Sequence, residues 1–241
     1  HGKHLITASY ISDHIKSFDT QVKQKNLIWL NEIGLDPGLD HMSAMRLIDA
    51  IKADNGEVTS FVSWCGGLPA PEHAGNPLGY KFSWSPAGVL RALGNPARFL
   101  DHGEEVNVEG RDLLSTTRQI NLHPAFRFEG YPNRDSLKYI DTYGLNRKHL
   151  QTMFRGTLRY GGFADFMSVM QSLGFLDVVP SVKYASWRAA ILDSLKVTMD
   201  GHDLDLCRML ADRLPHMQID RVKAILQSMQ ELSMLDANTP Y

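Results

Sequence analysis

The sequence predicts an α/β fold that gives way to an all-helical part. Over the first 65 residues, strand-like and helix-like patterns alternate, which is typical of a sheet whose strands are joined by crossover helices. From about residue 160 to the end, apolar residues recur at helical spacing alone. We therefore expect a domain boundary near Tyr160.

Composition limits the classes of protein that fit this pattern. Of the 241 residues, 43% are hydrophobic and 22% are charged, as in a globular protein with a buried core. The formal net charge is only −2, so the chain lacks the broad charge that would attract nucleic acid or an anionic membrane surface. No apolar run reaches the length of a membrane span. A net charge this close to zero fits better with a small molecule that is bound at one local site.

The two cysteines, Cys65 and Cys207, lie far apart and form no CxxC or Cys/His spacing. Neither a disulfide framework nor a zinc site is indicated, and no metal site is expected elsewhere. Such use of cysteine is typical of a reducing, intracellular compartment.

The first strand is expected over residues 4–10. Ser12 is then a suitable cap for a helix that ends at Lys25-Asn26, because its hydroxyl can accept a free backbone N–H of the first turn. Residues 27–34 form a short apolar run of the kind that a strand buried on both faces shows. We expect the helix to be the crossover between these two strands.

The stretch NEIGLDPGLDHM, residues 31–42, joins the second strand to the next helix and contains Asp36. An Asp directly before Pro37 can cap a helix, because its carboxylate accepts the N–H groups of the first turn. Alternatively, Asp36 is held for chemistry, since ligands of open α/β sheets bind beyond the carboxyl ends of the strands. Both interpretations stay open. Cys65, which ends the next strand at 57–65, is likewise either a buried hydrophobe or a site residue.

The middle of the chain is less regular. Residues 66–80 are too rich in Gly and Pro to be helical and are expected to form a lid or binding loop. Ser85 caps a short helix that begins at Pro86, and residues 98–110 are expected to form a hairpin. Three later helical stripes are core rather than cofactor sites: Phe163, Phe166, Met167 and Met170; Leu204, Cys207, Ala211 and Leu214; Val222, Leu226, Met229 and Leu232.

Two turn-like stretches, GYPNRDS at 130–136 and FRGTLRY at 154–160, contain arginines. Taken singly, Arg134, Arg155 and Arg159 fit exposed surface ion pairs, which are common. Near the ligand-binding edge of a sheet, they would also fit a substrate with several carboxylates, which a guanidinium binds bidentately. The chain has no GxGxxG, GxxxxGK[ST], GxSxG or HExxH motif, so these residues alone indicate no more than a small-anion site.

Five longer blocks resemble, in the same order, the glutamate-forming saccharopine dehydrogenases, a family that also forms the carboxyl-terminal half of a bifunctional aminoadipic semialdehyde synthase in animals. The resemblance runs over about residues 1–175. The blocks are TASYIS at 7–12, NEIGLDPGLDH at 31–41, CGGLPAPEHAGNPLGYKFSWSP at 65–86, GYPNRDS at 130–136 and RGTLRYGGF at 155–163.

The resemblance implies a three-part organisation. Residues 1–38 would be the tail of a Rossmann-like dinucleotide-binding domain that lacks its Gly-rich loop. Residues 39–160 would be a mixed-sheet α/β substrate-binding domain, and residues 161–241 part of an inserted all-helical domain. Because the chain starts at His1 without a methionine, we expect an internal fragment that is inactive by itself.

The resemblance also implies an activity in lysine metabolism. Saccharopine would pass a hydride to NAD or NADP, and the resulting imine would be hydrolysed to glutamate and 2-aminoadipate 6-semialdehyde, or the reverse reaction would run. The expected partners are these small molecules, and neither nucleic acid nor a membrane is expected as a partner. The expected location is the cytoplasm or the mitochondrion. A homo-oligomer is possible in either case. The missing Gly-rich loop favours a competing interpretation, a catalytically silent relative or fragment that serves as a binding module.

The same resemblance assigns site residues. Catalytic residues would be Asp36, Tyr10 and Cys65, the cysteine without a nucleophilic role because this chemistry requires none. Asp36 would stabilise the developing iminium, handle protons or orient the substrate. Substrate-binding residues would be Ser9, Tyr10, Asp36, Arg134, Arg155, Gly156 and Thr157. Cofactor-binding residues would be Ser9, Tyr10, Leu35, Phe82, Ser83, Trp84 and Ser85.

Overall fold

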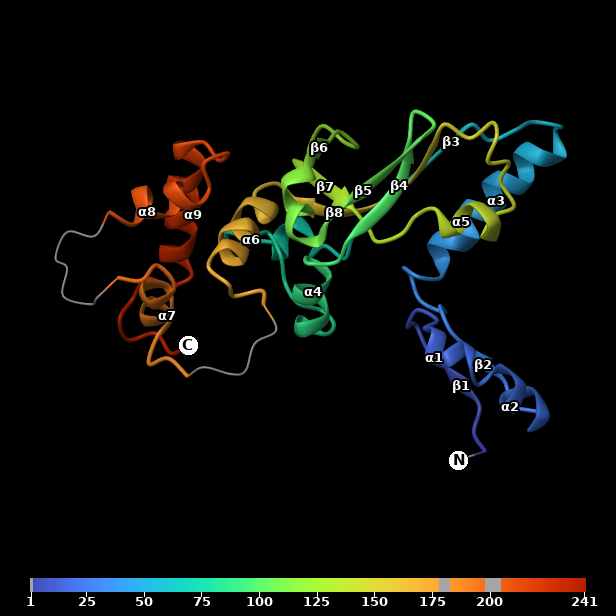
Figure 1. The fold of residues 1–241 in the computed structure, drawn as a ribbon, viewed down its shortest axis with the longest axis horizontal. Helices are drawn as coiled ribbons and strands as arrows, with labels where there is room; N and C mark the ends of the chain where they lie inside the picture. The colour runs from blue at the N-terminus through green and yellow to red at the C-terminus, as the bar shows by residue number, and fades with distance from the viewer. Residues whose placement is uncertain (1, 178–182, 198–204) are drawn as a thin grey trace. The chain divides into compact units, whose positions relative to one another are not determined.

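The computed structural model describes residues 2–177, 183–197 and 205–241 (Figure 1). The chain forms two compact units, and each is described by itself. The first unit comprises His1–Phe61 and Leu137–Met153, and the second comprises Val62–Ser136 and Phe154–Tyr241. The predicted combination of strands and helices in one α/β fold is confirmed, whereas the three-part division stays a prediction.

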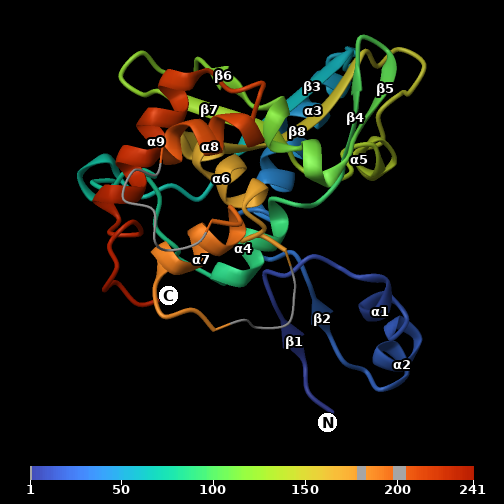
Figure 2. The same cartoon turned by 60° about the vertical axis from the view of Figure 1, so that its left-hand side comes forward.

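The first unit begins with two short parallel strands, β1 (Leu5–Ile6) and β2 (Trp29–Leu30). The crossover between them consists of α1 (Asp13–Lys16) and α2 (Asp19–Gln24), where a single helix was expected (Figure 2). Ser12 caps α1 as predicted, its hydroxyl accepting the N–H of Ile15 at 3.2 Å. Both strands are much shorter than predicted, since among the described residues they pair only with each other.

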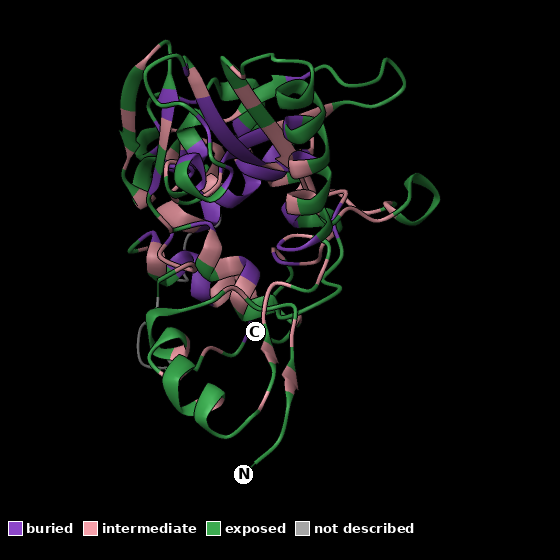
Figure 3. Cartoon of the chain, turned by 90° about the vertical axis from the view of Figure 1, so that its right-hand side faces the viewer, coloured by how far each residue is buried: buried purple, intermediate pink, exposed green. Residues whose placement is uncertain are grey.

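Two further helices complete the first unit. The first, α3 (Leu39–Ala53), buries Ala44 and Ile48, and the second, α5 (Lys138–Thr142), buries Tyr139 and Ile140. In contrast, α1, α2, β1 and β2 contain no buried residue, and Figure 3 shows these four elements in the colours of exposed and intermediate residues. The strand predicted at residues 27–34 is therefore not buried on both faces, contrary to prediction, since Leu30 of β2 is 45% exposed. In β1, Ile6 is 68% exposed.

The second unit is built on a six-stranded sheet of order β5-β4-β8-β7-β6, with β3 also paired to β8. The neighbours β4 and β5, β6 and β7, and β7 and β8 are antiparallel. The first residues of β3 and β8 belong to the first unit. The predicted hairpin is confirmed, with His102 and Gly103 at its tip. The strands are β3 (Ser60–Cys65), β4 (Ala97–Asp101), β5 (Glu104–Val108), β6 (Arg118–Ile120), β7 (Phe128–Pro132) and β8 (Thr152–Tyr160).

Helices of the second unit supply most of its core. Ser85 caps α4 through the N–H of Gly88, and Pro86 is its first residue, as predicted. The first predicted helical stripe is confirmed as buried, while Leu204 of the second lies outside the described residues. The α-helices are α4 (Pro86–Ala92), α6 (Phe163–Ser172), α7 (Trp187–Ser194), α8 (Leu206–Arg213) and α9 (Ile219–Glu231). In the part of the chain that the structure describes, 3-10 helices span Pro71–His73, Gly110–Asp112 and Leu114–Thr116.

Helix α6 begins with a cap that comes from the neighbouring strand. Its own N-cap is Gly162, at a φ of 102°, which has no side chain to offer. Instead, the Glu129 carboxylate accepts the N–H of Gly162 at 3.0 Å and that of Ala164 at 2.7 Å. Burial raises the pKa of Glu129, although these two hydrogen bonds oppose the rise. Glu129 thus joins β7 to the first turn of α6, where its carboxylate accepts two backbone N–H groups that have no partner within the helix.

A buried charge lies beside this cap. Arg159 is only 7% exposed, so its interpretation as a surface ion pair is wrong. Its guanidinium carbon lies 4.9 Å from the ring centroid of Tyr80 and 5.3 Å from that of Phe163, and its Nη1 donates to the Leu158 carbonyl at 2.8 Å. Aromatic faces therefore stabilise this cation within the core. Close to it, burial raises the pKa of Tyr131 to about 12, against the lowering effect of the Arg159 charge.

Two glycines allow an indole to lie against the sheet. A Cβ added to Gly156 would lie 2.2 Å from Cζ3 of Trp64, and one added to Gly130 would lie 2.4 Å from the same atom. Trp64 also packs against Phe154, with ring centroids 4.9 Å apart. Strands β7 and β8 therefore need glycine at these two positions to admit the ring.

We expect Gly156→Ala to lower the free energy of unfolding by about 1–3 kcal/mol, because the added methyl forces the Trp64 ring off the strand. Urea denaturation followed by circular dichroism measures the change. Gly67→Ala is the control, since a Cβ there would meet nothing within 4 Å. Equal effects of the two substitutions would contradict the close packing of the indole on β8.

Tyr131 should make the fold sensitive to alkali. The pKa of this phenol is near 10 in the unfolded chain, and burial raises it to about 12 in the native one. Its stabilising contribution is therefore complete below pH 10 and is lost as the pH rises towards 12, a loss of about 2–3 kcal/mol. We expect Tyr131→Phe to show a shallower decline in unfolding free energy over this range. Urea denaturation at successive pH values measures it, with the exposed Tyr241→Phe as the control.

Candidate active site

The turn that carries Asp36 does not cap the following helix. Helix α3 starts at Leu39, and its N-cap is Gly38, which has no side chain that could accept an N–H of the first turn. The Asp36-Pro37 peptide is cis, and the N–H of Gly34 donates to the Pro37 carbonyl at 2.9 Å across the turn. The interpretation of Asp36 as a helix cap is therefore wrong, and its carboxylate is directed elsewhere.

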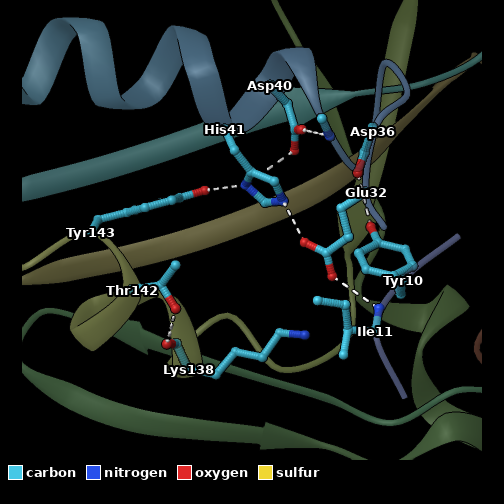
Figure 4. A network of polar contacts seen from close by, with 10 residues as sticks. Tyr10, Ile11, Glu32, Asp36, Asp40, His41, Lys138, Thr142 and Tyr143 are labelled. Carbon is cyan, nitrogen blue, oxygen red and sulfur yellow. Dashed lines mark hydrogen bonds and ion pairs between the residues drawn. The ribbon is translucent and has the colours of Figure 1, made fainter. Parts of the chain in front are cut away.

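Asp36 instead meets Tyr10. The Tyr10 hydroxyl donates a hydrogen bond of 2.8 Å to Oδ1 of Asp36, and both side chains are half-buried (Figure 4). The two residues are 26 positions apart and come from the segments that follow β1 and β2. The two strands are parallel, so their carboxyl ends open on the same edge of the sheet. Two of the predicted catalytic residues are thus brought together within the first unit.

Glu32 holds the main chain on both sides of Tyr10. Its N–H donates to the Ser9 carbonyl at 3.1 Å, and its Oε1 accepts the N–H of Ile11, also at 3.1 Å. Glu32 adopts a φ of 59°, in the left-handed region that few residues other than glycine occupy. The sequence contains no signal for this role, because it depends on a tertiary contact between distant segments.

His41 and Lys138 also face this network (Figure 4). Nδ1 of His41 lies 2.7 Å from the Tyr143 hydroxyl, and its Nε2 lies 3.7 Å from Oε2 of Glu32. Nζ of Lys138 lies 5.6 Å from the centroid of the Tyr10 ring. Neither was predicted as a site residue, although His41 closes the block NEIGLDPGLDH and Lys138 follows GYPNRDS by two positions.

The arrangement combines a carboxylate, a phenol and a nearby ammonium group. The Asp36 carboxylate, already oriented by Tyr10, can stabilise a positive charge on a bound amine or iminium. The Lys138 ammonium can carry or release a proton in the same neighbourhood. This is chemistry suited to an amine substrate rather than to nucleophilic attack.

The two arginines predicted to bind the substrate, Arg134 and Arg155, belong to the second unit, and Arg155 is buried like Arg159. Arg155 is 5% exposed, so the surface ion-pair interpretation is wrong for it too; Arg134 is exposed and has a φ of 51°. The N–H of Arg155 donates to Oγ of Ser136 at 3.0 Å, and its carbonyl accepts the N–H of Asn133 at 2.8 Å. These bonds attach the block GYPNRDS to β8. Since Asp36 lies in the first unit, a crevice shared with the arginines stays a prediction.

The remaining predicted site residues have ordinary local settings. Cys65 ends β3 and is half-buried. Leu35 is 64% exposed, Phe82 is 45% exposed and Trp84 is 56% exposed. Their contacts with a cofactor stay predictions, as do those of Ser83 and Ser85. Within the described residues, no group of three His, Cys, Asp or Glu side chains could hold a metal ion. No helix of the described part is long and apolar enough to cross a bilayer.

Comparison with known proteins agrees with the five sequence blocks. A family model described as Saccharopine dehydrogenase C-terminal domain matches residues 34–235, beyond the last block. The chain is 37% identical to saccharopine dehydrogenase (NADP(+), L-glutamate-forming) of Schizosaccharomyces pombe, over 98% of this chain and 53% of that protein. It is 46% identical to alpha-aminoadipic semialdehyde synthase of Arabidopsis thaliana, over 73% of this chain and 16% of that protein.

A solved structure supports the same assignment. Apo histidine-tagged saccharopine dehydrogenase (L-Glu forming) from Saccharomyces cerevisiae superposes with a TM-score of 0.80 at 34% identity, over 98% of this chain and 53% of that one. The chain therefore spans about half the length of these two yeast proteins.

Proposed function

Because this chain belongs to the saccharopine dehydrogenase C-terminal domain family, as its sequence blocks predicted, we propose that it handles the substrate in a glutamate-forming saccharopine dehydrogenase. The reaction oxidises the carbon beside the secondary amine of saccharopine and hydrolyses the imine to glutamate and 2-aminoadipate 6-semialdehyde, or runs in reverse. The observation that carries the proposal is the 2.8 Å hydrogen bond between Tyr10 and Asp36, which sets a carboxylate at the carboxyl edge of two parallel strands.

Asp36 acts on the amine of the substrate. Loss of a hydride leaves an iminium whose positive charge a nearby carboxylate stabilises more strongly than it stabilises the neutral amine. The Tyr10 hydroxyl donates to Oδ1, and this hydrogen bond sets the direction in which the carboxylate faces. Tyr10 therefore orients Asp36, and Lys138 is a candidate for moving a proton during imine hydrolysis.

Guanidinium groups bind the carboxylates of the substrate. Saccharopine carries three carboxylates, and a guanidinium fork binds each such group bidentately with a defined orientation. Arg134 and the Arg155-Gly156-Thr157 segment of β8 take this role. Support comes from the hydrogen bonds that fix the backbone of Arg155 to Ser136 and Asn133, because a fixed backbone limits where its guanidinium can lie.

A nicotinamide cofactor, NAD or NADP, supplies the hydride acceptor. The described residues fit one part of such a group: Leu35, Phe82 and Trp84 expose apolar surface, which a nicotinamide or adenine ring can cover. The sequence has no GxGxxG, and so we assign no pyrophosphate-binding residues. Ser9 and Tyr10 would lie where cofactor and substrate meet. The mouse relative's name places that protein in the mitochondrion, which is consistent with an intracellular location here.

Two assays test the proposal. Saccharopine oxidation by the complete polypeptide that carries these residues should reduce NAD or NADP and release glutamate. Calorimetry on residues 1–241 with saccharopine and with each cofactor separates this function from that of a silent binding module. Substrate-dependent cofactor reduction supports the proposal; a complete polypeptide that neither binds nor oxidises saccharopine would overturn it.

We expect Arg134→Ala in that polypeptide to lower kcat/KM for saccharopine by about 30-fold, equivalent to about 2 kcal/mol, because a charge-assisted hydrogen bond to a carboxylate is lost. Steady-state kinetics measures the change. Arg111→Ala is the matched control, since the Arg111 side chain is 84% exposed and lies in the same unit. Unchanged kinetics in Arg134→Ala would remove this residue from the site.

A further inference from the structure

We infer that Glu32 and His41 form a positioning pair that fixes Tyr10 against Asp36. The inference rests on the proposed function, in which Tyr10 orients the carboxylate that acts on the amine. Neither residue would touch the substrate; both act through the main chain around Tyr10. Two hydrogen bonds, in which Glu32 donates its N–H to the Ser9 carbonyl and accepts the N–H of Ile11, are called the Glu32 clamp.

The Glu32 clamp leaves Tyr10 little freedom. One residue binds the carbonyl before Tyr10 and the N–H after it, each at 3.1 Å, so the peptide planes on both sides are fixed. The Tyr10 side chain then points at Asp36, which lies only four positions after Glu32. Because the same short loop supplies the clamp and the carboxylate, the two ends of the Tyr10-Asp36 hydrogen bond share one support.

The backbone of Glu32 indicates that its side chain is needed. A φ of 59° is rare for a residue with a long side chain, and Gly, Asn or Asp are the usual occupants. Such a conformation costs free energy and persists where the surrounding contacts hold it. Glycine would relieve this strain but would remove the acceptor for the N–H of Ile11.

His41 faces the other oxygen of the same carboxylate, Oε2, at 3.7 Å and without a hydrogen bond to it. The His41 side chain is 18% exposed and packs against Tyr139, with ring centroids 5.1 Å apart and ring planes tilted by 30°. When the Tyr143 hydroxyl donates to Nδ1, the proton of the imidazole resides on Nε2, which faces Oε2 of Glu32 at 3.7 Å. Tyr143 is 2% exposed, so the ring of His41 is supported from the core of the first unit. Nε2 is buried and has no hydrogen bond within the described residues, and the Glu32 carboxylate is the acceptor that it faces there.

His41 thus links the core to the clamp. Tyr143 and Tyr139 hold His41, His41 faces Glu32, and Glu32 holds the main chain around Tyr10. Asp40 also lies near the ring, its Oδ2 3.8 Å from Nδ1, but its Oδ1 already accepts the N–H of Gly38 at 2.7 Å. Asp40 therefore binds the backbone at the start of α3, whereas Glu32 binds the backbone on both sides of Tyr10.

Kinetics of the complete polypeptide tests the positioning role. We expect His41→Phe, which retains a ring against Tyr139, and Glu32→Ala to lower kcat for saccharopine by about 10- to 100-fold. KM should change by less than about threefold, because carboxylate binding elsewhere sets the ground-state affinity. Glu32→Gln keeps an acceptor for the N–H of Ile11 and should recover most of the activity. His149→Phe, an exposed histidine of the same unit that pairs with Glu57, should leave both constants unchanged.

A double substitution separates positioning from a general structural effect. If His41 acts through Tyr10, then His41→Phe should have no further effect on kcat in a Tyr10→Phe background. Multiplicative losses would overturn the inference. Thermal unfolding of each variant shows whether it is folded at the assay temperature, and Glu32→Ala replaces His41→Phe in the double substitution if the latter is not.

A readout without catalysis keeps this inference distinct from the proposed function. In residues 1–241 labelled with ¹⁵N, the N–H of Ile11 should exchange with solvent at least about tenfold faster in Glu32→Ala and His41→Phe than in the parent chain. In His149→Phe the rate should not change. Unaltered exchange in His41→Phe would overturn the positioning pair even if the polypeptide oxidises saccharopine, and an inactive polypeptide with accelerated exchange would overturn the proposed function alone.

Discussion

The hydrogen bond between Tyr10 and Asp36 is the interaction on which the candidate site depends. It joins residues 26 positions apart, and neither side chain would face the other without the parallel pairing of β1 and β2. Glu32 then fixes the peptide planes on both sides of Tyr10. A carboxylate oriented in this way needs no rearrangement when positive charge develops on a substrate, which is how preorganised groups stabilise transition states.

In the second unit, the corresponding constraint is the way β8 is packed. One face of this strand carries Arg155, Thr157 and Arg159, because alternate residues of a strand point to the same side. On the other face, Gly156 admits the Trp64 ring. The Trp64 ring therefore packs on the face of β8 opposite to the one that carries the arginines. The Arg159 guanidinium packs on the rings of Tyr80 and Phe163 in the core. Arg155 is held by a hydrogen bond from its backbone N–H to Ser136.

Local signals predicted many elements, and long-range contacts account for the misses. Ser12 and Ser85 cap their helices as expected, and the hairpin turns at His102 and Gly103, since caps and tight turns depend on neighbours in sequence. The strands at 4–10 and 27–34 were predicted too long, because strand length depends on partners that composition does not reveal. Asp36 before Pro37 looked like a helix cap, yet the turn directs its carboxylate to Tyr10.

By itself, the sequence determined the family, the α/β class with its helical continuation, and the residues Tyr10, Asp36, Arg134 and Arg155 as candidates, because these are carried by ordered blocks and periodic patterns. Only the tertiary structure decided that Asp36 accepts a hydrogen bond from Tyr10 and that Arg155 and Arg159 are buried. It also decided that Glu32 accepts the N–H of Ile11, next to Tyr10, and that His41 faces Glu32. Burial and contact between distant segments are properties of the folded chain, and no local pattern encodes them.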